Sequence, residues 1–304
     1  DEKLAHPILI GRREVVQMRL DRLGLRLKMD KDFELCDPTN DPRYKDYWTT
    51  YYKLMARQGV SPDFAKLIVR TNTTVIGALM VERDEADAMI AGPVGRFSKH
   101  IEDLLSILGR APETSTIAAL DVLITTKGTH FICDTHVNYN PSAEELADIT
   151  LMAAEQVRSF GIEPKIALVS HSNFGSNPSE SAKKMQKVWH IIKHVAPELE
   201  IDGELQADAA LNTESRHRVH PDSLLTGNAN LLIMPNLDAA HIAFNMAKVL
   251  GDGEEIGPIL LGIRKTAHVL TPSASSRTII NMTALAAVDV ERRNSYHEAF
   301  QKKN

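Results

Sequence analysis

Short β-rich segments alternate with longer helical patterns along the chain, which predicts an α/β protein whose sheets are largely parallel. At 304 residues the chain exceeds the usual domain size of about 100–200 residues, which favours two domains. The segments expected to form strands are rich in aliphatic and β-branched residues. They are Pro7–Gly11, Leu25–Met29, Ala86–Gly92, Ala118–Thr125, Thr129–Asp134, Lys165–Ser172, Asn230–Pro235 and Pro258–Gly262.

Helices are predicted from apolar spacing and from capping residues. The sequence S-A-E-E from Ser142 matches a capping box, and apolar residues then recur at helical spacing up to Val157. Gly161 is expected to end this helix. Tyr44–Met55 and Phe97–Leu108 are two further helical patterns, and we interpret their aromatic and leucine faces as core.

Composition excludes several classes of function. A formal net charge of −5 and a pI near 6.2 argue against nucleic-acid binding, which usually needs a clustered basic excess. No stretch approaches the roughly 18 apolar residues of a membrane span, and the charged N-terminus lacks a secretory apolar region. Cys36 and Cys133 are expected to be small buried hydrophobes in a reducing compartment. We therefore expect a cytoplasmic protein with no nucleic-acid or membrane partner.

The loop Ser170–Ser176, S-H-S-N-F-G-S, follows a predicted strand and precedes a helix that opens near Pro178. Backbone N–H groups and small hydroxyls in such a turn can bind a phosphate or a carbonyl, helped by the helix N-terminus. The loop has neither the G-x-G-x-x-G spacing of a dinucleotide site nor the lysine of a P-loop. A plain capping loop remains the alternative interpretation.

Two further clusters do not point to a site. Asp134–Asn138, D-T-H-V-N, pairs a carboxylate with a histidine, but no second set of ligands has convincing spacing, so no metal site is predicted. The cluster Arg216–His220, R-H-R-V-H, precedes a turn and is expected to lie on an exposed loop. Sequence alone cannot define a Ser-His-Asp triad, because a triad is a geometric arrangement.

Three segments match motifs of one known family. Ala86–Gly92 matches A-D-x-M-V-x-G, Asp202–Ala210 matches D-G-E-L-Q-x-D-A-A, and Asn228–Ile242 matches A-N-x-L-I-x-P and the residues after it. With these motifs, nearly the whole chain resembles the phosphotransacetylases. The resemblance implies two α/β/α domains with largely parallel sheets and an interdomain cleft. That fold is similar to the fold of isocitrate and isopropylmalate dehydrogenases.

The resemblance also implies a domain plan. In that family the chain builds one domain, inserts a second and returns to the first. Carried over, residues 1–140 plus 262–304 form the first domain and 141–261 the second, with the break at the Asn140-Pro141 step. The family's first strand and helix have no counterpart ahead of Leu4–Gly11, so we expect the chain to be a fragment.

A closer resemblance rests on five segments: His6–Arg12, Asp41–Tyr51, Ala167–Ser176, Leu270–Ser273 and Ile280–Ala286. They are similar to the phosphotransacetylase-like C-terminal domain of bacterial hybrid NADP-dependent malic enzymes. This implies a catalytically silent domain that binds acetyl-coenzyme A as an allosteric effector of the malic enzyme half, which decarboxylates malate to pyruvate. NADP and a divalent metal would belong to that half, with no cofactor in this domain. The expected partners are that half and further copies, in a homodimer or higher homo-oligomer.

The segment Gly257–Asp289 resembles the family's catalytic signature with its reactive groups replaced. Gly262, Lys265, Leu270, Ser275, Ile279 and Asn281 are in register with the family pattern. The family has a serine that holds the coenzyme A thiol, an arginine that stabilises negative charge and an aspartate proposed as base. This chain has Thr271, Pro272 and Thr278 there. Losing such a cation commonly costs about 10²–10³ in rate, and a general base contributes about 10²–10⁴.

Three functional interpretations follow. The first is a regulatory domain that senses acetyl-coenzyme A without catalysis. The second is an active phosphate acetyltransferase that moves acetyl between acetyl phosphate and coenzyme A with other residues of the same cleft. The third is an assembly domain with a relic pocket. From the local residues alone, Thr271-Pro272-Ser273 could also be a simple loop before a helix.

The resemblance and the residue chemistry together define the expected acetyl-coenzyme A contacts, which combine hydroxyls and amides with cations suited to phosphate. They are Arg96, Ser170, Ser172, Asn173, Ser176, Arg264, Thr271, Ser273, Ser275 and Arg277. Lys99 and Lys265 are further cations expected near the cleft. Glu102 stands where many catalytic members have an arginine. The helix after Ser275 is expected to use an apolar face for packing or for a dimer contact, formed by Ile279, Met282, Leu285 and Ala286.

Overall fold

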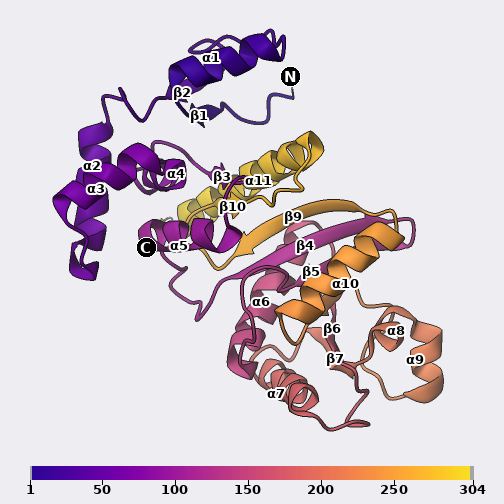
Figure 1. Cartoon of the computed structure of the whole chain (residues 1–304). Helices are drawn as coiled ribbons and strands as arrows, with labels where there is room; N and C mark the ends of the chain where they lie inside the picture. The colour runs from indigo at the N-terminus through magenta and orange to yellow at the C-terminus, as the bar shows by residue number, and fades with distance from the viewer. Residues whose placement is uncertain (1, 302–304) are drawn as a thin grey trace. The chain divides into compact units, whose positions relative to one another are not determined.

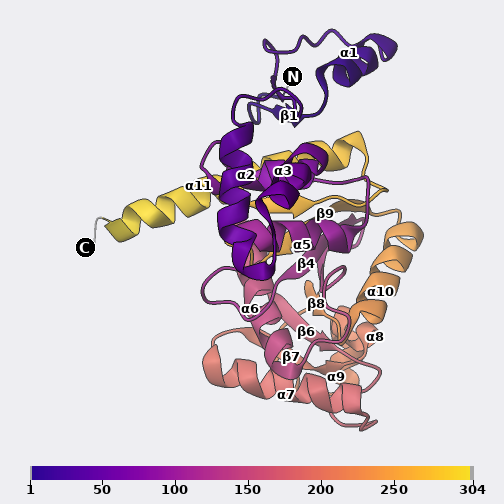
Figure 2. The same ribbon diagram turned by 60° about the vertical axis from the view of Figure 1, so that its left-hand side comes forward.

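The computed structural model describes residues 2–301, and the side chains of residues 2–293 (Figures 1 and 2). The chain forms two compact units. Unit 1 contains the residues up to Gly109 and those from Ile263 onward, and unit 2 is Arg110–Gly262. The first break therefore lies at Gly109 and not at the Asn140-Pro141 step, because both strands between these points pair within the sheet of unit 2.

In the described part of unit 1, two short parallel strand pairs are surrounded by helices. β1 (Ile8–Ile10) pairs with β2 (Glu34–Cys36), and β3 (Met89–Ala91) pairs with β10 (Ala267–Val269). The helices are α1 (Arg13–Arg22), α2 (Tyr44–Met55), the 3-10 helix η1 (Ala56–Gln58), α3 (Pro62–Thr71), α4 (Thr73–Glu82), α5 (Phe97–Leu108) and α11 (Ser276–Gln301). Because residues 74–81 of α4 are all buried, this helix forms the centre of the unit, and α2, α3 and α5 pack against it.

In unit 2, whose residues are all described, six strands form one sheet in the order β7-β6-β8-β5-β4-β9. The strands are β4 (Ala118–Thr125), β5 (Gly128–Cys133), β6 (Lys165–Val169), β7 (Glu200–Leu205), β8 (Leu231–Ile233) and β9 (Glu254–Leu261). β7, β6, β8 and β5 run parallel, whereas β4 is antiparallel to both of its neighbours. The helices are α6 (Ala143–Ser159), α7 (Glu180–Val195), α8 (Ala207–Leu211), α9 (Thr213–Val219) and α10 (Leu237–Leu250).

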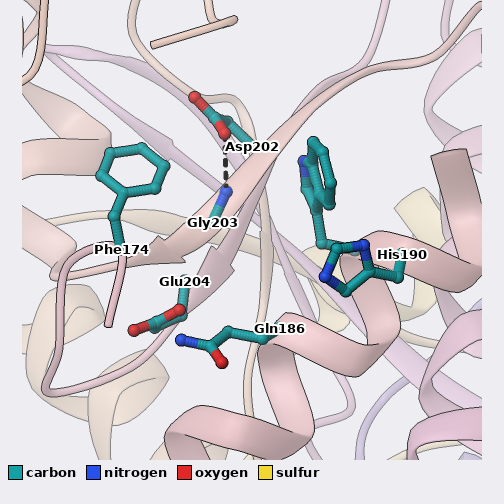
Figure 3. Close-up of a pocket in the computed structure, with 7 residues that line it drawn as sticks. Phe174, Gln186, His190, Asp202, Gly203 and Glu204 are labelled. Atoms are coloured by element: carbon teal, nitrogen blue, oxygen red, sulfur yellow. Dashed lines mark hydrogen bonds between the residues drawn. The ribbon is translucent and has the colours of Figure 1, made fainter. Parts of the chain in front are cut away.

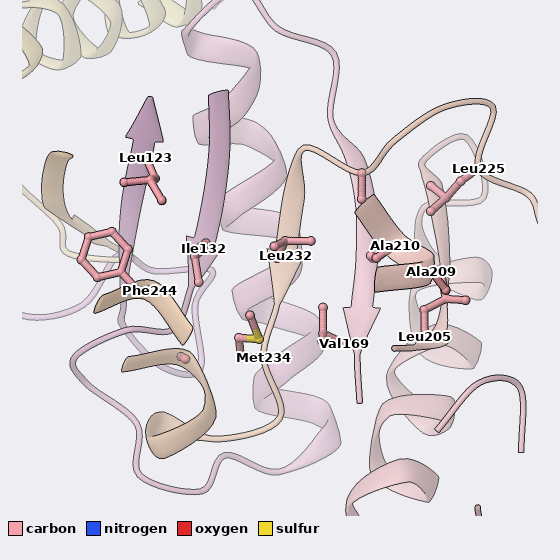
Figure 4. Close-up of a cluster of buried hydrophobic side chains, with 13 residues drawn as sticks. Leu123, Ile132, Val169, Leu205, Ala209, Ala210, Leu225, Leu232, Met234 and Phe244 are labelled. Carbon is pink, nitrogen blue, oxygen red and sulfur yellow. The ribbon is translucent and has the colours of Figure 1, made fainter. Parts of the chain in front are cut away.

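Alternate residues of these strands build an apolar cluster on one face of the sheet (Figure 4). Leu123, Ile132 and Leu232 lie on neighbouring strands and pack with Phe244 of α10. The side-chain period of two along a strand sends the intervening residues to the other face, and α6 contacts β5 and β8. The sheet is thus covered by helices, as parallel sheets usually are.

The α/β class and the largely parallel sheets are confirmed. α2 and α5 have the predicted bounds, and the capping box of α6 forms in full, with Ser142 and Glu145 bonding each other's backbone N–H. The predicted strand Leu25–Met29 is wrong. Leu25 and Leu27 are exposed there, because β1 takes its parallel partner from Glu34–Cys36 instead.

Two predictions about individual side chains are corrected. Arg216 does not lie on an exposed loop: it is fully buried on α9, where its guanidinium donates hydrogen bonds to four carbonyls, those of Ala209, Ala210, Leu225 and Gly227. On α11, Met282, Leu285 and Ala286 are buried as core residues, but Ile279 is exposed.

Cys36 and Cys133 are free and buried, as predicted. Burial raises the pKa of the Cys36 thiol to about 12, so it stays protonated and unreactive. Within residues 2–301 no single helix has both the length and the apolar character of a membrane span. The bent pair α3 and α4 reaches them only jointly, by length and composition.

Candidate functional site

The altered signature lies at one edge of the β3–β10 pair in unit 1. Because these strands are parallel, the loops that follow them start at the same edge: residues 92–96 lead to α5, and residues 270–275 lead to α11. The backbone N–H of Leu270 donates to the carbonyl of Ala91 at 2.9 Å. A Cβ on Gly92, whose φ is +85°, would lie 2.3 Å from the Leu270 carbonyl oxygen. Glycine is therefore required for these two loops to meet.

Five of the predicted contact residues lie on these two loops or on the first turn of α11: Arg96, Thr271, Ser273, Ser275 and Arg277. Arg96 is the N-cap residue of α5, and its side chain is exposed. Arg277 is the second residue of α11 and is also exposed. Two helix N-termini with their cations thus lie at one strand edge, an arrangement that attracts anions.

Thr278, which the resemblance aligns with the family's aspartate, caps α11. The backbone N–H of Thr278 donates to Ser275 Oγ at 3.1 Å, and the backbone N–H of Ser275 donates to Thr278 Oγ1 at 3.2 Å. The Thr278 side chain is buried, and its hydroxyl also contacts Ser275 Oγ at 3.1 Å. Thr271 and Ser273 bond each other at 2.8 Å across the exposed Pro272. At positions 271, 272 and 278 the described chain has two threonines and a proline, and so neither a carboxylate nor a cation.

The other predicted cations form ion pairs with acidic side chains. Arg264 and Lys265 precede β10 and so lie at the opposite end of that strand from Thr271. Arg264 donates to the carbonyl of Leu108 at 2.7 Å and pairs with Glu82 at 2.6 Å. Lys265 Nζ lies 2.6 Å from Asp84. Lys99 pairs with Asp103 at 3.0 Å and with Glu102 at 3.4 Å.

His100 is a residue of this region that sequence reasoning missed. Its Nε2 bonds the carbonyl of Val94 at 2.8 Å, and its Nδ1 bonds Thr74 Oγ1 of the buried helix α4, also at 2.8 Å. Gly95, with φ +110°, allows this approach, because a Cβ there would lie 2.9 Å from His100 Nε2. His100 thus holds the loop of residues 92–96 against the core, a role for which the sequence gives no motif.

The loop Ser170–Ser176 of unit 2 turns its donors inward. Ser172 Oγ and the backbone N–H of Gly175 both donate to Glu204 Oε1, at 2.8 and 2.7 Å. The backbone N–H of Asn173 donates to Ser176 Oγ at 3.0 Å, and that of Phe174 to the carbonyl of Glu204 at 3.0 Å. The carboxylate of Glu204 therefore occupies the concave side of the loop, where an anionic ligand would otherwise accept these bonds.

The D-G-E-L-Q motif, Asp202–Gln206, hydrogen-bonds to this loop. Besides Glu204, Gln206 exchanges two hydrogen bonds with Asn173, at 2.7 and 3.1 Å. Ser170 Oγ is buried without a hydrogen-bond partner among the described residues. Glu204 and Gln206 were missed as site residues, although the motif itself signalled a special segment. Ser172, Asn173 and Ser176 lie together in this loop; their contact with acetyl-coenzyme A stays a prediction.

A cavity of about 200 Å³ adjoins this loop (Figure 3). Phe174 of the loop, three residues of α7 and the strand β7 line it. The α7 residues are Gln186, Trp189 and His190, and β7 contributes Asp202, Gly203 and Glu204. The aromatic rings and carboxylates give it a character unlike that of the basic edge in unit 1.

The Asp134–Asn138 cluster is a structural turn. Asp134 Oδ1 accepts the backbone N–H groups of Ala119, His136 and Val137, and its Oδ2 accepts both the backbone and side-chain N–H of Asn138. His136 Nδ1 lies 3.3 Å from the buried carboxylate of Asp121. Among the described residues, no group of three or more histidine, cysteine, aspartate or glutamate side chains is placed to hold a metal ion.

Comparison with known proteins settles the family. The model of the phosphate acetyl/butaryl transferase family matches residues 1–287. The chain belongs to this family. A phosphotransacetylase structure from Streptococcus pyogenes superposes on this family member with a TM-score of 0.85 at 28% identity. The match covers 94% of this chain and 86% of that one.

Two curated relatives are longer than this phosphate acetyl/butaryl transferase family member. An NAD-dependent malic enzyme of Rhizobium meliloti is 51% identical over 289 residues, and an NADP-dependent malic enzyme of Escherichia coli is 50% identical over 289 residues. Each match covers 95% of this chain but 38% of the relative. The predicted likeness to a phosphotransacetylase-like domain of malic enzymes is therefore confirmed. The two relatives are named for different coenzymes, so the likeness does not choose between NAD and NADP.

Proposed function

We propose that this chain is the regulatory domain of a malic enzyme, which binds acetyl-coenzyme A as an allosteric effector without transferring the acetyl group. The observation that carries the proposal is the capping pair Ser275 and Thr278 beside Pro272. The hydroxyl that stands in place of the family's base is engaged with the backbone N–H of the helix cap. Thr278 cannot act as a general base at neutral pH, and Pro272 supplies no positive charge.

Binding a ligand at the strand edge where α5 and α11 begin requires fewer chemical groups than catalysis there would. The two adjacent helix N-termini and the exposed Arg96 and Arg277 favour the phosphates of coenzyme A electrostatically. Ser273 and Thr271 add hydroxyl donors on the connecting loop.

The rest of the polypeptide completes the proposal. The malic enzyme half would oxidatively decarboxylate malate with NAD or NADP and a divalent metal, and this domain would convey the effector signal and support self-association. Effector binding and the state of the other half are linked reciprocally: an effector can change the behaviour of that half only by its differential affinity for two states. A coupling of about 1–3 kcal/mol corresponds to a change of about 5- to 150-fold.

An active phosphate acetyltransferase is the second candidate, and the close fit to the Streptococcus pyogenes phosphotransacetylase favours it. The two candidates differ in turnover. We expect negligible formation of acetyl-coenzyme A from acetyl phosphate and coenzyme A by this chain. A turnover of order 10 s⁻¹, the ordinary enzyme median, would support the second candidate and overturn the first.

A gain-of-function variant sharpens that assay. Restoring the family's groups with Thr271→Ser, Pro272→Arg and Thr278→Asp together leaves α11 with a good cap, because aspartate at the third helical position also suits a helix N-terminus. We expect this triple variant to exceed the parent in transacetylase rate. Equal and measurable rates in both would show that the parent catalyses with other residues.

The regulatory role is tested in the intact polypeptide. Malate-dependent NAD(P)H formation is measured with and without acetyl-coenzyme A, and again after removal of this region. We expect the effector to change the rate of the intact protein only. An equal effect on both proteins would show that acetyl-coenzyme A acts elsewhere.

A further inference from the structure

Two carboxylates line the cavity beside the loop Ser170–Ser176. Asp202 and Glu204 line it together with His190, and none of its described lining residues is a lysine or an arginine (Figure 3). Asp202 is already satisfied: its Oδ2 accepts from Ser223 Oγ and from the backbone N–H of Leu224, both at 2.7 Å. The capacity to bind a further donor therefore belongs to Glu204.

Glu204 is the second acidic residue that lines this cavity. Its side chain is fully buried, and Oε1 accepts from Ser172 and Gly175. Oε2 is buried and has no hydrogen-bond partner among the described residues. A buried carboxylate oxygen without a donor is costly, and a charged donor offsets that cost better than a neutral one.

Two aromatic rings line the same cavity. Phe174 and Trp189 both line the cavity, and Trp189 Nε1 is likewise buried without a partner among the described residues. An organic cation next to such rings gains about 0.5–2 kcal/mol from the ring quadrupoles. Phe174 is 41% exposed on a surface loop, and its ring packs edge-on against His220 with a centroid distance of 4.9 Å.

We propose that this cavity binds a small organic cation, an alkylammonium or guanidinium group, with Glu204 Oε2 as its acceptor and the rings of Phe174 and Trp189 as its walls. The site takes a ligand of opposite charge to acetyl-coenzyme A and does not depend on the regulatory function proposed above. Because Glu204 also holds Ser172 and Gly175, occupation of the cavity rigidifies the loop Ser170–Ser176.

The competing explanation is that Gln186 alone covers the carboxylate. Figure 3 shows its amide beside Glu204. Under that explanation the pair is a closed structural contact and no external cation binds. The two explanations differ in whether a charged probe binds more tightly than a neutral probe of the same shape.

The test is a calorimetric titration of the chain with methylguanidine, with N-methylurea as the neutral probe of similar shape. We expect saturable, millimolar binding of methylguanidine and none of N-methylurea. Glu204→Gln keeps an acceptor for Ser172 and Gly175 but replaces Oε2 with a donor. We therefore expect it to weaken the binding of methylguanidine at least tenfold. His194→Gln, on the exposed side of the same helix, is the matched control and should bind like the parent.

Tryptophan emission gives a second measurement that needs no Glu204 variant. In a Trp48→Phe background the emission reports Trp189, and methylguanidine should change it with the same midpoint as the calorimetric curve. The proposal is overturned if the two probes bind equally, if neither saturates, or if a folded Glu204→Gln variant binds methylguanidine as tightly as the parent.

Discussion

Ser275 and Thr278 close the N-terminus of α11 reciprocally, each accepting the other's backbone N–H through its hydroxyl, at 3.1 and 3.2 Å. The two positions are three apart in sequence, the spacing of a capping box, with threonine in the place where glutamate or glutamine usually stands. The segment that resembles a catalytic signature thus has a structural use for the side chain that replaces the base.

This cap predicts a stability effect. Ser275→Ala removes the acceptor for the Thr278 N–H, and we expect the free energy of unfolding to fall by about 1 kcal/mol. Urea unfolding measures it. Ser276→Ala, one residue later on the exposed helix surface, should change stability by less than about 0.5 kcal/mol. Equal losses in both variants would show that the cap contributes little.

The close approach of the two loops at Gly92 predicts a larger loss of stability when this glycine is substituted. Gly92→Ala combines a left-handed φ of +85° with a Cβ placed 2.3 Å from the Leu270 carbonyl oxygen. Gly59 has a similar φ of +83°, but a Cβ there would meet no atom within 4 Å, so Gly59→Ala isolates the conformational cost of about 1–2 kcal/mol. We expect Gly92→Ala to lower the melting temperature clearly more than Gly59→Ala. Equal shifts would mean that the loops separate without cost.

The buried guanidinium of Arg216 predicts strong destabilisation when it is removed. Arg216→Met leaves its four carbonyl acceptors without that donor, and we expect a loss of at least about 3 kcal/mol in the free energy of unfolding. Arg218→Met, an exposed position on the same helix, is the control and should cost less than about 0.5 kcal/mol. Chemical denaturation of both variants gives the comparison.

His268 predicts a pH dependence of stability. Burial lowers the pKa of this imidazole to about 4, although the carboxylate of Asp289 lies 3.8 Å away. The unfolded chain binds the proton near its ordinary pKa of about 6.5. Between these values the unfolded state binds more protons, so stability falls as the pH drops, by about 2 kcal/mol between pH 7 and pH 5.

Comparing pH profiles checks this contribution. Unfolding free energies of the parent and of His268→Gln are measured from pH 7 to pH 5, and the variant should lose about 2 kcal/mol less over that range. His194→Gln, which changes an exposed histidine, should follow the parent. Parallel profiles for the parent and His268→Gln would show that His268 accepts a proton without unfolding.

Strong local signals predicted much of the fold. The full capping box of α6 and the aromatic and leucine faces of α2 and α5 gave the right elements, because capping and helical periodicity act within one segment. The error at Leu25–Met29 has the opposite cause. Alternation there is as good as in a strand, but strand formation depends on a partner that lies elsewhere in the chain.

The candidate site was predictable only in part. Parallel strand ends bring Arg96 and Arg277, which were both predicted as contact residues, to one edge. The inward turn of Ser172 and Gly175 toward Glu204 depends on a contact across about thirty residues of sequence, and spacing does not reveal it. Arg216 was misjudged because arginine is rarely buried, and only its four carbonyl partners make burial tolerable.

The central claim is that this chain binds acetyl-coenzyme A through the edge where α5 and α11 begin. Calorimetric titration with acetyl-coenzyme A tests it most directly, using the parent, Arg277→Ala and the control Arg57→Ala, which removes the same charge from an exposed position elsewhere in unit 1. We predict saturable binding by the parent, a loss of about 10- to 150-fold in affinity for Arg277→Ala, and little change for Arg57→Ala. Absence of saturable binding by the folded parent would contradict the claim.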